Sequence, residues 1–379
     1  MIAAEVAGTA ASGIRAIANA AWAIPGAIRL ELGEPDFATP AHIVEAAHAA
    51  ALAGHTRYGP SAGLPVLREA VVAKLARDNA LDGVTPDRVV VGAGGVGALF
   101  AAYRTLLGAG DEILVPDPGW TNFSTLATML GAVPRGYRLD PAAGHTPDYE
   151  HLDALCGPRT RAILVNSPSN PVGYQWDADQ LAAVGAWAAR RGLVVVSDEC
   201  YDQLWLDRPA VTFAAAAPEV PSVTVYSLSK SYAMTGWRVG YAVTTPELAA
   251  GLARVQEATA SCVNTVAQHA AVAALTGDQT PVAAMRDAYR DRRDTALRTA
   301  QDLGLSATRP AGAFYLWLRT DVSPVDLLHR TGTAVAPGTA FGARGAGHVR
   351  LSLAAAQDDI VRGLTNIAAP SSPQKSPEK

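Results

Sequence analysis

The sequence predicts an α/β protein built on a mostly parallel sheet. Short, continuous apolar runs rich in valine and isoleucine alternate along the chain with segments of helical spacing. Strands covered by helices on both faces have this uninterrupted apolar character, whereas strands with one wet face alternate apolar and polar residues. The length of 379 residues exceeds what one small core needs and indicates two subdomains.

The first hundred residues give an arm, two helices and the first buried strand. Residues 1–25 are alanine-rich and weakly patterned, which suggests an arm or a short helix, and the strand-like Ile28–Leu32 leads into the loop Gly33–Phe37. Helical spacing then predicts helices at His42–Ala53 and Gly63–Arg77. A short buried strand at Arg88–Val91 follows, and the glycine loop after it opens a helix that runs through Leu107.

From there strands and helices alternate, as βαβ units do. The predicted strands are Glu112–Val115, Arg161–Val165, Leu193–Val196 and Ser222–Tyr226. The predicted helices between them are Asn122–Leu130 and Asp177–Arg191.

The last third of the chain changes character. A long helical region covers Pro246–Leu303 and leads into an α+β segment, in which strands at Ala313–Leu318 and His348–Leu353 flank a helix at Val325–Arg330, with a final helix after them. The tail Ala369–Lys379 is rich in proline, serine and lysine, which predicts disorder.

Composition excludes several classes of protein. The net charge is −4 and no block of lysine or arginine runs along the chain, which argues against nucleic-acid binding. No segment has the roughly 18–20 continuous apolar residues that a membrane span needs, and no secretory signal pattern opens the chain. Three cysteines without a CxxC pair indicate reduced thiols, no metal centre and a cytoplasmic location.

A glycine loop predicts a phosphate site. Gly92–Gly97 fits G-x-G-x-x-G between a strand and a helix, and Asp111 and Asp117 follow at about the distance that a dinucleotide fingerprint requires. An NAD-dependent dehydrogenase is therefore one interpretation. Yet any glycine loop before a helix N-terminus offers free N–H groups to a phosphate. The choice of cofactor depends on later residues.

Lys230 is the residue that decides between the cofactors. Lysine is scarce in this chain, occurring only as Lys74, Lys230, Lys375 and Lys379. Arginine stays protonated in proteins, whereas a lysine amine can deprotonate and form a Schiff base with a carbonyl. A lysine kept in the apolar, hydroxyl-rich stretch around Lys230 favours pyridoxal 5′-phosphate, since the dinucleotide interpretation leaves it without a role.

The other requirements of that cofactor can be met from nearby segments. Asp198 ends an apolar strand, where a buried carboxylate needs a cation such as a protonated ring nitrogen. Tyr201 and Asn170 can donate to the 3-oxygen of the ring, the latter from the rigid turn Asn166–Gly173. Each also has an ordinary structural explanation, as a strand-end aspartate, a packing tyrosine or a plain loop.

Phosphate and substrate groups have candidates too. Ser227, Arg238 and the loop amides of Gly95 and Val96 together suit a phosphate dianion. Trp120 can stack on a ring, or pack in a core. Arg350, in the strand-like His348–Leu353, suits bidentate capture of a carboxylate, although it could equally be a surface arginine on an edge strand.

These ordered motifs resemble the fold-type I pyridoxal phosphate enzymes of the class I aminotransferase family, which includes aspartate aminotransferase. The resemblance covers nearly the whole chain, through segments that recur in the family's order: Gly33–Phe37, Tyr58–Arg68, Asn166–Gly173, Asp198–Tyr201, Ser227–Arg238 and Arg350. It implies the PLP-transferase fold, with a mostly parallel seven-stranded sheet in the large domain and a small α+β domain formed by both chain ends.

The resemblance also implies domain boundaries and a homodimer with sites at the subunit interface. The arm and part of the small domain would cover residues 1–45, the large domain 46–284, the small domain 285–368 and the tail 369–379.

The resemblance implies a role for each site residue. Lys230 is the Schiff-base lysine, Asp198 lies at the ring nitrogen, Asn170 and Tyr201 at the 3-oxygen, and Trp120 on the ring. Gly95, Val96, Ser227 and Arg238 hold the phosphate, and Tyr58 reaches the phosphate of the partner subunit. Gly33 lies near the substrate, whose α-carboxylate Arg350 binds.

The implied activity is transamination between an L-amino acid and a 2-oxo acid by a ping-pong mechanism. Two departures from the related aspartate enzymes favour a neutral or aromatic donor: Val96 stands where a lysine helps bind the distal carboxylate, and the other family arginine that reads a dicarboxylate has no clear match. Alternatives with the same residues are a lyase or a biosynthetic synthase. A transcriptional sensor with an aminotransferase-like domain would need a DNA-binding module, for which the segment before Gly33 leaves no room.

Overall fold

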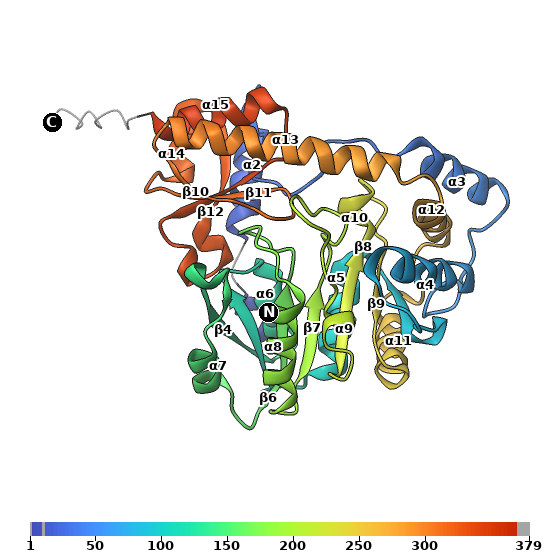
Figure 1. Cartoon of the computed structure of the whole chain (residues 1–379). Helices are drawn as coiled ribbons and strands as arrows, with labels where there is room; N and C mark the ends of the chain where they lie inside the picture. The colour runs from blue at the N-terminus through green and yellow to red at the C-terminus, as the bar shows by residue number, and fades with distance from the viewer. Residues whose placement is uncertain (1, 10–11, 370–379) are drawn as a thin grey trace.

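The computed structural model describes residues 2–9 and 12–369 and places them in two parts, each built on its own sheet (Figure 1). The predicted disordered tail lies outside the described residues except for Ala369. In the described part of the chain, no helix is both long and apolar enough to cross a membrane.

The larger sheet carries the predicted α/β alternation. Five of its strands run parallel in the order β8-β7-β6-β3-β4, and β9, β2 and β5 add antiparallel edges. The expected seven strands are joined by an eighth, the two-residue β5. In spatial order the strands are β2 (Val89–Gly92), β9 (Gly240–Val243), β8 (Ser222–Ser227), β7 (Val194–Asp198), β6 (Thr160–Asn166), β3 (Glu112–Asp117), β4 (Val133–Asp140) and β5 (Thr146–Pro147).

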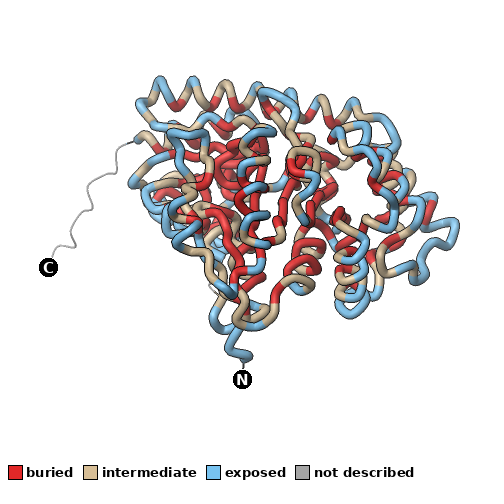
Figure 2. The backbone as a smooth tube through the Cα atoms, turned by 60° about the horizontal axis from the view of Figure 1, so that its bottom comes forward, coloured by how far each residue is buried: buried red, intermediate tan, exposed pale blue. Residues whose placement is uncertain are grey.

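Helices cover both faces of this sheet, which explains its uninterrupted apolar strands. One face packs against α5 (Gly94–Leu106), α6 (Thr121–Met129) and α11 (Pro246–Ala260). The other packs against α3 (Ala41–Leu52), α4 (Pro65–Asn79), α7 (Tyr149–Leu155), α8 (Ala178–Ala189), α9 (Phe213–Ala216) and α12 (Thr265–Thr276). Figure 2 shows the buried backbone concentrated in the strands and the exposed backbone on the outer helices.

The smaller part joins both ends of the chain. Its sheet has the order β1 (Ile28–Leu30), β12 (Thr333–Pro337), β13 (His348–Ser352), β11 (Tyr315–Arg319) and β10 (Ser306–Thr308). Its helices are α2 (Gly13–Trp22), α13 (Thr280–Asp302), α14 (Pro324–Thr331) and α15 (Gln357–Ala368), and the short α1 (Ala4–Ala7) lies against α6. Figure 1 shows α13 running along the top of the molecule from this sheet towards α12.

Three differences from the sequence expectations have physical reasons. The long helical region is three helices, because Ser261 takes a positive φ of 57° after α11 and Gly277 ends α12. The strands β9 and β12 were not predicted, since Gly240–Val243 and Thr333–Pro337 are short and rich in small residues. Their pairing in the sheets, not their local pattern, makes them strands.

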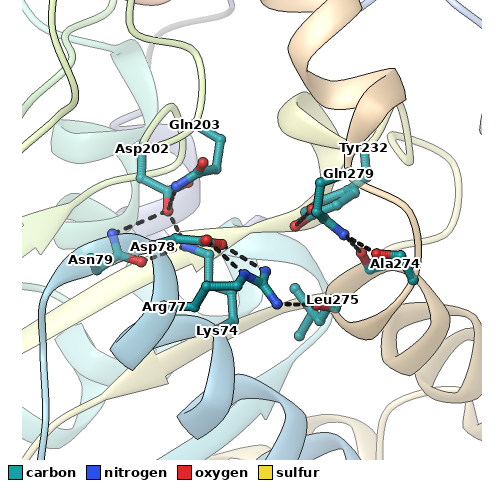
Figure 3. Close-up of polar contacts among 11 residues, drawn as sticks. Lys74, Arg77, Asp78, Asn79, Asp202, Gln203, Tyr232, Ala274, Leu275 and Gln279 are labelled. Carbon is teal, nitrogen blue, oxygen red and sulfur yellow. Dashed lines mark hydrogen bonds and ion pairs between the residues drawn. The ribbon is translucent and has the colours of Figure 1, made fainter.

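A buried ion pair links helix α4 to the chain just after strand β7. Lys74 on α4 donates to Asp202, just after β7, and to the side-chain oxygen of Asn79 at 2.7 Å (Figure 3). The Lys74 and Asp202 side chains are 2% and 6% exposed. The ammonium also lies 5.0 Å from the ring centre of Tyr226, near the end of β8. Lys74 therefore ties together two neighbouring strand ends.

Replacing Lys74 with methionine should lower the free energy of unfolding by about 3 kcal/mol or more, because Asp202 would keep a buried, unpaired charge. Urea denaturation would measure the change. The matched control is Arg77→Met on the same helix, which removes an ion pair to Asp78 in which the arginine is 43% exposed (Figure 3). We expect that control to cost less than about 1 kcal/mol. Equal losses in the two variants would contradict the bracing role of Lys74.

Candidate active site

A cavity of about 560 Å³ opens at the carboxyl ends of β6, β7 and β8. Asn166 and Asp198 are register partners at the ends of β6 and β7, and Asp198 pairs in turn with Val225 of β8. Parallel strands bring their carboxyl ends to one edge, where open α/β sheets hold their ligands. The cavity brings together the predicted residues Gly33, Gly95, Val96, Trp120, Asn170, Asp198, Tyr201, Ser227, Lys230, Arg238 and Arg350.

Asp198 is a buried carboxylate suited to a cationic partner. It is 5% exposed and accepts a hydrogen bond from the backbone N–H of Cys200 at 3.1 Å. Burial raises the pKa of Asp198, while the Cys200 hydrogen bonds and the charge of Lys230 oppose that shift. A protonated ring nitrogen would supply the cation that the buried carboxylate needs in order to stay ionised.

Lys230 presents an amine that loses its proton easily. It lies on the single turn α10 (Leu228–Ser231), which begins directly after β8, and its Nζ donates to the carbonyl of Gly33 at 2.6 Å. Burial lowers the pKa of Lys230 to about 8, although the neighbouring Cys200 and Glu34 pull the pKa upward. A lysine with such a pKa has a substantial neutral fraction near physiological pH, which nucleophilic attack on an aldehyde requires.

The N-terminus of α5 and the Arg238 guanidinium form an anion cradle. The N-cap residue Ala93 offers no side-chain hydrogen bond to the first turn, so the helix's free N–H groups remain available. At Gly94, whose φ is +74°, an added Cβ would lie 2.4 Å from the nearest nitrogen of Arg238, so the backbone and the guanidinium meet closely here. Ser227 lines the same wall. This arrangement fits a phosphate group.

Tyr201 lies beside a second tyrosine that sequence patterns did not single out. The hydroxyls of Tyr201 and Tyr315 are 2.8 Å apart, and burial raises the pKa of Tyr201 well above its ordinary value. Both phenols therefore stay neutral and can donate hydrogen bonds.

Arg350 is a buried arginine on an interior strand. The edge-strand interpretation is wrong, because β13 lies between β12 and β11, and Arg350 is 2% exposed. Its guanidinium donates to the side-chain oxygen of Asn170 at 2.9 Å and to the carbonyl of Glu31 at 2.6 Å. Its Nε has no hydrogen-bond partner among the described residues, and burial lowers the pKa of Arg350. A buried guanidinium with unused donor capacity suits a carboxylate ligand.

Tyr58 is the predicted residue that lies outside this cavity. Its side chain is 90% exposed and borders a separate groove with Arg57 and Cys262. The prediction for Tyr58 concerns the phosphate of a partner subunit, and it stays a prediction.

Several cavity residues were missed by sequence reasoning. Cys200 and Tyr315 belong to stretches whose apolar pattern points to a core. A further group comes from the arm before the first strand: Ser12, Ile14, Arg15 and Trp22. The weak pattern of residues 1–25 gave no signal that residues of α2 line the cavity, because the packing of α2 against β12 and α14 places them there.

The dinucleotide interpretation of Gly92–Gly97 does not fit the topology. The strand β2 before the loop is an antiparallel edge strand paired with β9, not the first strand of a parallel βαβ unit. Asp111 pairs with Arg161, and Asp117 accepts from the backbone N–H of Arg344, so neither acts as the expected acidic residue.

Comparison with known proteins agrees with this geometry. Residues 25–366 match the family model for aminotransferase class I and II. The chain is 39% identical over 350 residues to the aspartate/prephenate aminotransferase of Thermus thermophilus, covering 90% of each chain. It is 37% identical over 359 residues to the aspartate aminotransferase of Geobacillus stearothermophilus, again covering 90% of each.

Solved structures show the same likeness. The aspartate aminotransferase of Thermus thermophilus with maleate superposes with a TM-score of 0.92 at 36% identity, over 97% of this chain and 99% of that one. An alanine aminotransferase from Pyrococcus furiosus gives a TM-score of 0.89 at 32% identity, over 96% and 100%. These two related proteins share one fold and are named for different amino-acid substrates, aspartate and alanine.

The pKa of Lys230 predicts how capture of pyridoxal phosphate by the apoprotein depends on pH. The rate should rise with pH through about pH 8 and then level off, because only the neutral amine attacks the aldehyde. Stopped-flow absorbance would follow the capture, with a free lysine derivative as the control for the aldehyde's own titration. A midpoint near the ordinary lysine value of 10.5 would contradict the effect of burial.

Proposed function

We propose residue roles and a substrate class on one premise: this chain belongs to the class I and II aminotransferase family and is a pyridoxal phosphate-dependent enzyme. The observation that carries the proposal is the meeting of Lys230, Asp198 and Arg350 in one cavity. Lys230 is a partly buried amine with a lowered pKa, Asp198 is a buried carboxylate, and Arg350 is a buried guanidinium with unused donor capacity.

When bound, pyridoxal phosphate supplies the electron sink that lets the Cα–H bond of an amino acid break heterolytically. Lys230 Nζ would hold the cofactor through its aldehyde carbon, and the neutral amine would take the Cα proton of the substrate. Asp198 would keep the ring nitrogen protonated. Tyr201 and Asn170 would donate to the 3-oxygen, and Trp120 would pack on the ring.

The remaining residues hold the two anionic ends. Arg238, Ser227 and the backbone at Gly95 and Val96 would bind the phosphate at the α5 N-terminus. Arg350 would bind the substrate α-carboxylate. Asn170 accepts a hydrogen bond from its guanidinium, whose carbon lies 4.2 Å from the ring centre of Tyr315. Gly33 lines the same cavity and would lie near the substrate.

The donor of the first half reaction is a neutral or aromatic L-amino acid. Val96, Ile14 and Phe123 give the cavity apolar surface, and Val96 cannot bind a distal carboxylate. Apolar side chains gain free energy on such walls, whereas a charged side chain there would need its own partner.

The working form is a cytoplasmic homodimer. The 90% exposure of Tyr58 beside a groove supports a role outside its own subunit. The three cysteines, Cys156, Cys200 and Cys262, are free thiols, which supports a reducing compartment.

Absorbance of the purified, cofactor-loaded protein tests the proposal. We expect the visible band of the bound cofactor to bleach when leucine or phenylalanine is added without an acceptor, with a 2-oxo acid released in equal amount. Release of ammonia instead would favour a lyase or synthase. The loaded Lys230→Ala variant should keep bound cofactor but lose at least about 10³-fold in rate, since the proton-transfer group is gone. Substantial turnover by Lys230→Ala would refute its role.

Arg350→Lys provides a second test of the assigned roles. A lysine cannot make the bidentate contact, so kcat/KM for every amino acid should fall by about tenfold to a hundredfold. The variant should still retain its cofactor, because no cofactor atom is assigned to Arg350. Steady-state kinetics over a panel of donors would measure the loss, and a loss confined to one class of donor would contradict the assignment.

A further inference from the structure

Tyr315 is a buried tyrosine of the cavity to which the proposed roles assign no hydrogen bond. It lies on β11 of the small sheet, lines the cavity and is 1% exposed. Its hydroxyl is 2.8 Å from the hydroxyl of Tyr201, which follows β7 of the larger sheet. An added Cβ at Gly33 would lie 2.0 Å from the same oxygen, so the backbone of Gly33 packs directly against it. Contacts from both parts of the fold therefore fix the position of this hydroxyl.

The two phenols share one hydrogen bond, and its direction matters for the cofactor. Among the described residues, neither hydroxyl has a second hydrogen-bond partner. A phenol carries one proton and can donate one hydrogen bond. A Tyr201 that donates to Tyr315 has no proton left for the 3-oxygen of the cofactor. A Tyr201 that accepts from Tyr315 keeps its proton for that oxygen.

The charge of Arg350 favours Tyr315 as the donor. The guanidinium carbon lies 4.2 Å from the ring centre of Tyr315, and a cation beside a phenol makes the phenol more acidic. Burial raises the pKa of both phenols, whereas the charge of Arg350 opposes the rise. Their shared hydrogen bond further raises the pKa of Tyr201 and lowers that of Tyr315. The more acidic of two neutral phenols is the better donor, so the hydrogen bond runs from Tyr315 to Tyr201.

Asn170, the other proposed donor to the 3-oxygen, is oriented in the same way. Its side-chain oxygen accepts from Arg350 at 2.9 Å, which leaves its NH₂ group as the part that can donate into the cavity. Arg350 and Tyr315 lie on the paired strands β13 and β11. The small sheet thus occupies the accepting oxygen of Asn170, and Tyr315 is placed to do the same for Tyr201.

We propose that Tyr315 is a positioning residue whose hydroxyl donates to the oxygen of Tyr201 and thereby directs the Tyr201 proton to the 3-oxygen of the cofactor. This inference rests on the proposed function and adds a residue that acts through Tyr201. A donor that takes up negative charge of the 3-oxygen weakens the attraction of that oxygen for the proton on the nearby Lys230 nitrogen. Tyr315 therefore favours the unprotonated form of the nitrogen that joins Lys230 to the cofactor.

A pH titration of the cofactor-loaded enzyme tests the direction of the hydrogen bond, because the visible band of the bound cofactor changes as that nitrogen gains or loses its proton. Tyr315→Phe should raise the midpoint of the titration by about half a pH unit, since Tyr201 loses the hydrogen bond that supports its donation. Tyr201→Phe should raise the midpoint by about one unit or more, since a hydrogen bond to an anion is lost. The opposite direction predicts the opposite sign: loss of the Tyr315 acceptor would free the Tyr201 proton and lower the midpoint.

Two further variants separate this role from ordinary packing. The double variant Tyr201→Phe/Tyr315→Phe should titrate as Tyr201→Phe does, because a residue that acts through Tyr201 has no effect without it. Tyr289 on α13 is buried in the same hydrophobic cluster as Tyr315, and its hydroxyl has no hydrogen-bond partner among the described residues. Tyr289→Phe is therefore the matched control and should leave the midpoint unchanged.

Three outcomes would overturn the inference. One is an unchanged or lowered midpoint in Tyr315→Phe, a second is an additive shift in the double variant, and a third is an equal shift in Tyr289→Phe. A Tyr315→Phe protein that loses the cofactor while Tyr201→Phe retains it would overturn the inference as well, because Tyr315 would then act on more than Tyr201. Failure of the proposed function gives a different result, since no amino acid would then bleach the band of the unmodified enzyme.

Discussion

Burial of ionisable groups at the carboxyl edge of the parallel sheet is the constraint on which the site depends. Asp198 ends β7 and Lys230 follows β8, and desolvation acts on both. It raises the pKa of the carboxylate and lowers that of the amine, so it shifts each group towards its neutral form. A cofactor that brings a cationic ring nitrogen and an electrophilic aldehyde would relieve both penalties at once. The same desolvation that costs stability therefore shifts the two pKa values in the direction that binding of such a cofactor requires.

A second buried charge lies near the same strand ends and is fully paired. The described part of the chain holds two lysines, and both are largely removed from water: Lys230 faces the cavity, and Lys74 lies behind it. Lys74 is hydrogen-bonded and paired with Asp202, next to Tyr201 in the chain, and it contacts the Tyr226 ring, next to Ser227. The two lysines thus differ in their partners: Lys74 is paired with a carboxylate, whereas Lys230 donates to the backbone carbonyl of Gly33.

Two arginines from different parts of the fold line the cavity, Arg350 from strand β13 and Arg15 from helix α2. Arg350 lies on an interior strand of the small sheet. Its guanidinium donates to Asn170 and to the carbonyl of Glu31, and it contacts the Tyr315 ring. A cation fixed in this way suits the α-carboxylate, which all amino acids share. Arg15 lies on the N-terminal helix α2, is exposed and contacts the Trp22 ring.

Local sequence was enough to predict the parallel α/β alternation and the residues in Asn166–Gly173, Asp198–Tyr201 and Ser227–Arg238, since each chemical requirement sits beside a strand end where the chain itself places it. A strand that ends in Asp198 presents that carboxylate whatever the rest of the molecule does.

Tertiary structure decided what depends on distant pairing. It made Gly240–Val243 and Thr333–Pro337 into strands, put Arg350 in the interior of the small sheet, and set Tyr315 against Tyr201. It also folded α2 over the cavity and so made Arg15 a lining residue. Several of these facts follow from contacts between segments more than a hundred residues apart, such as β2 with β9, β1 with β12 and Tyr201 with Tyr315. No local periodicity records which surfaces will meet.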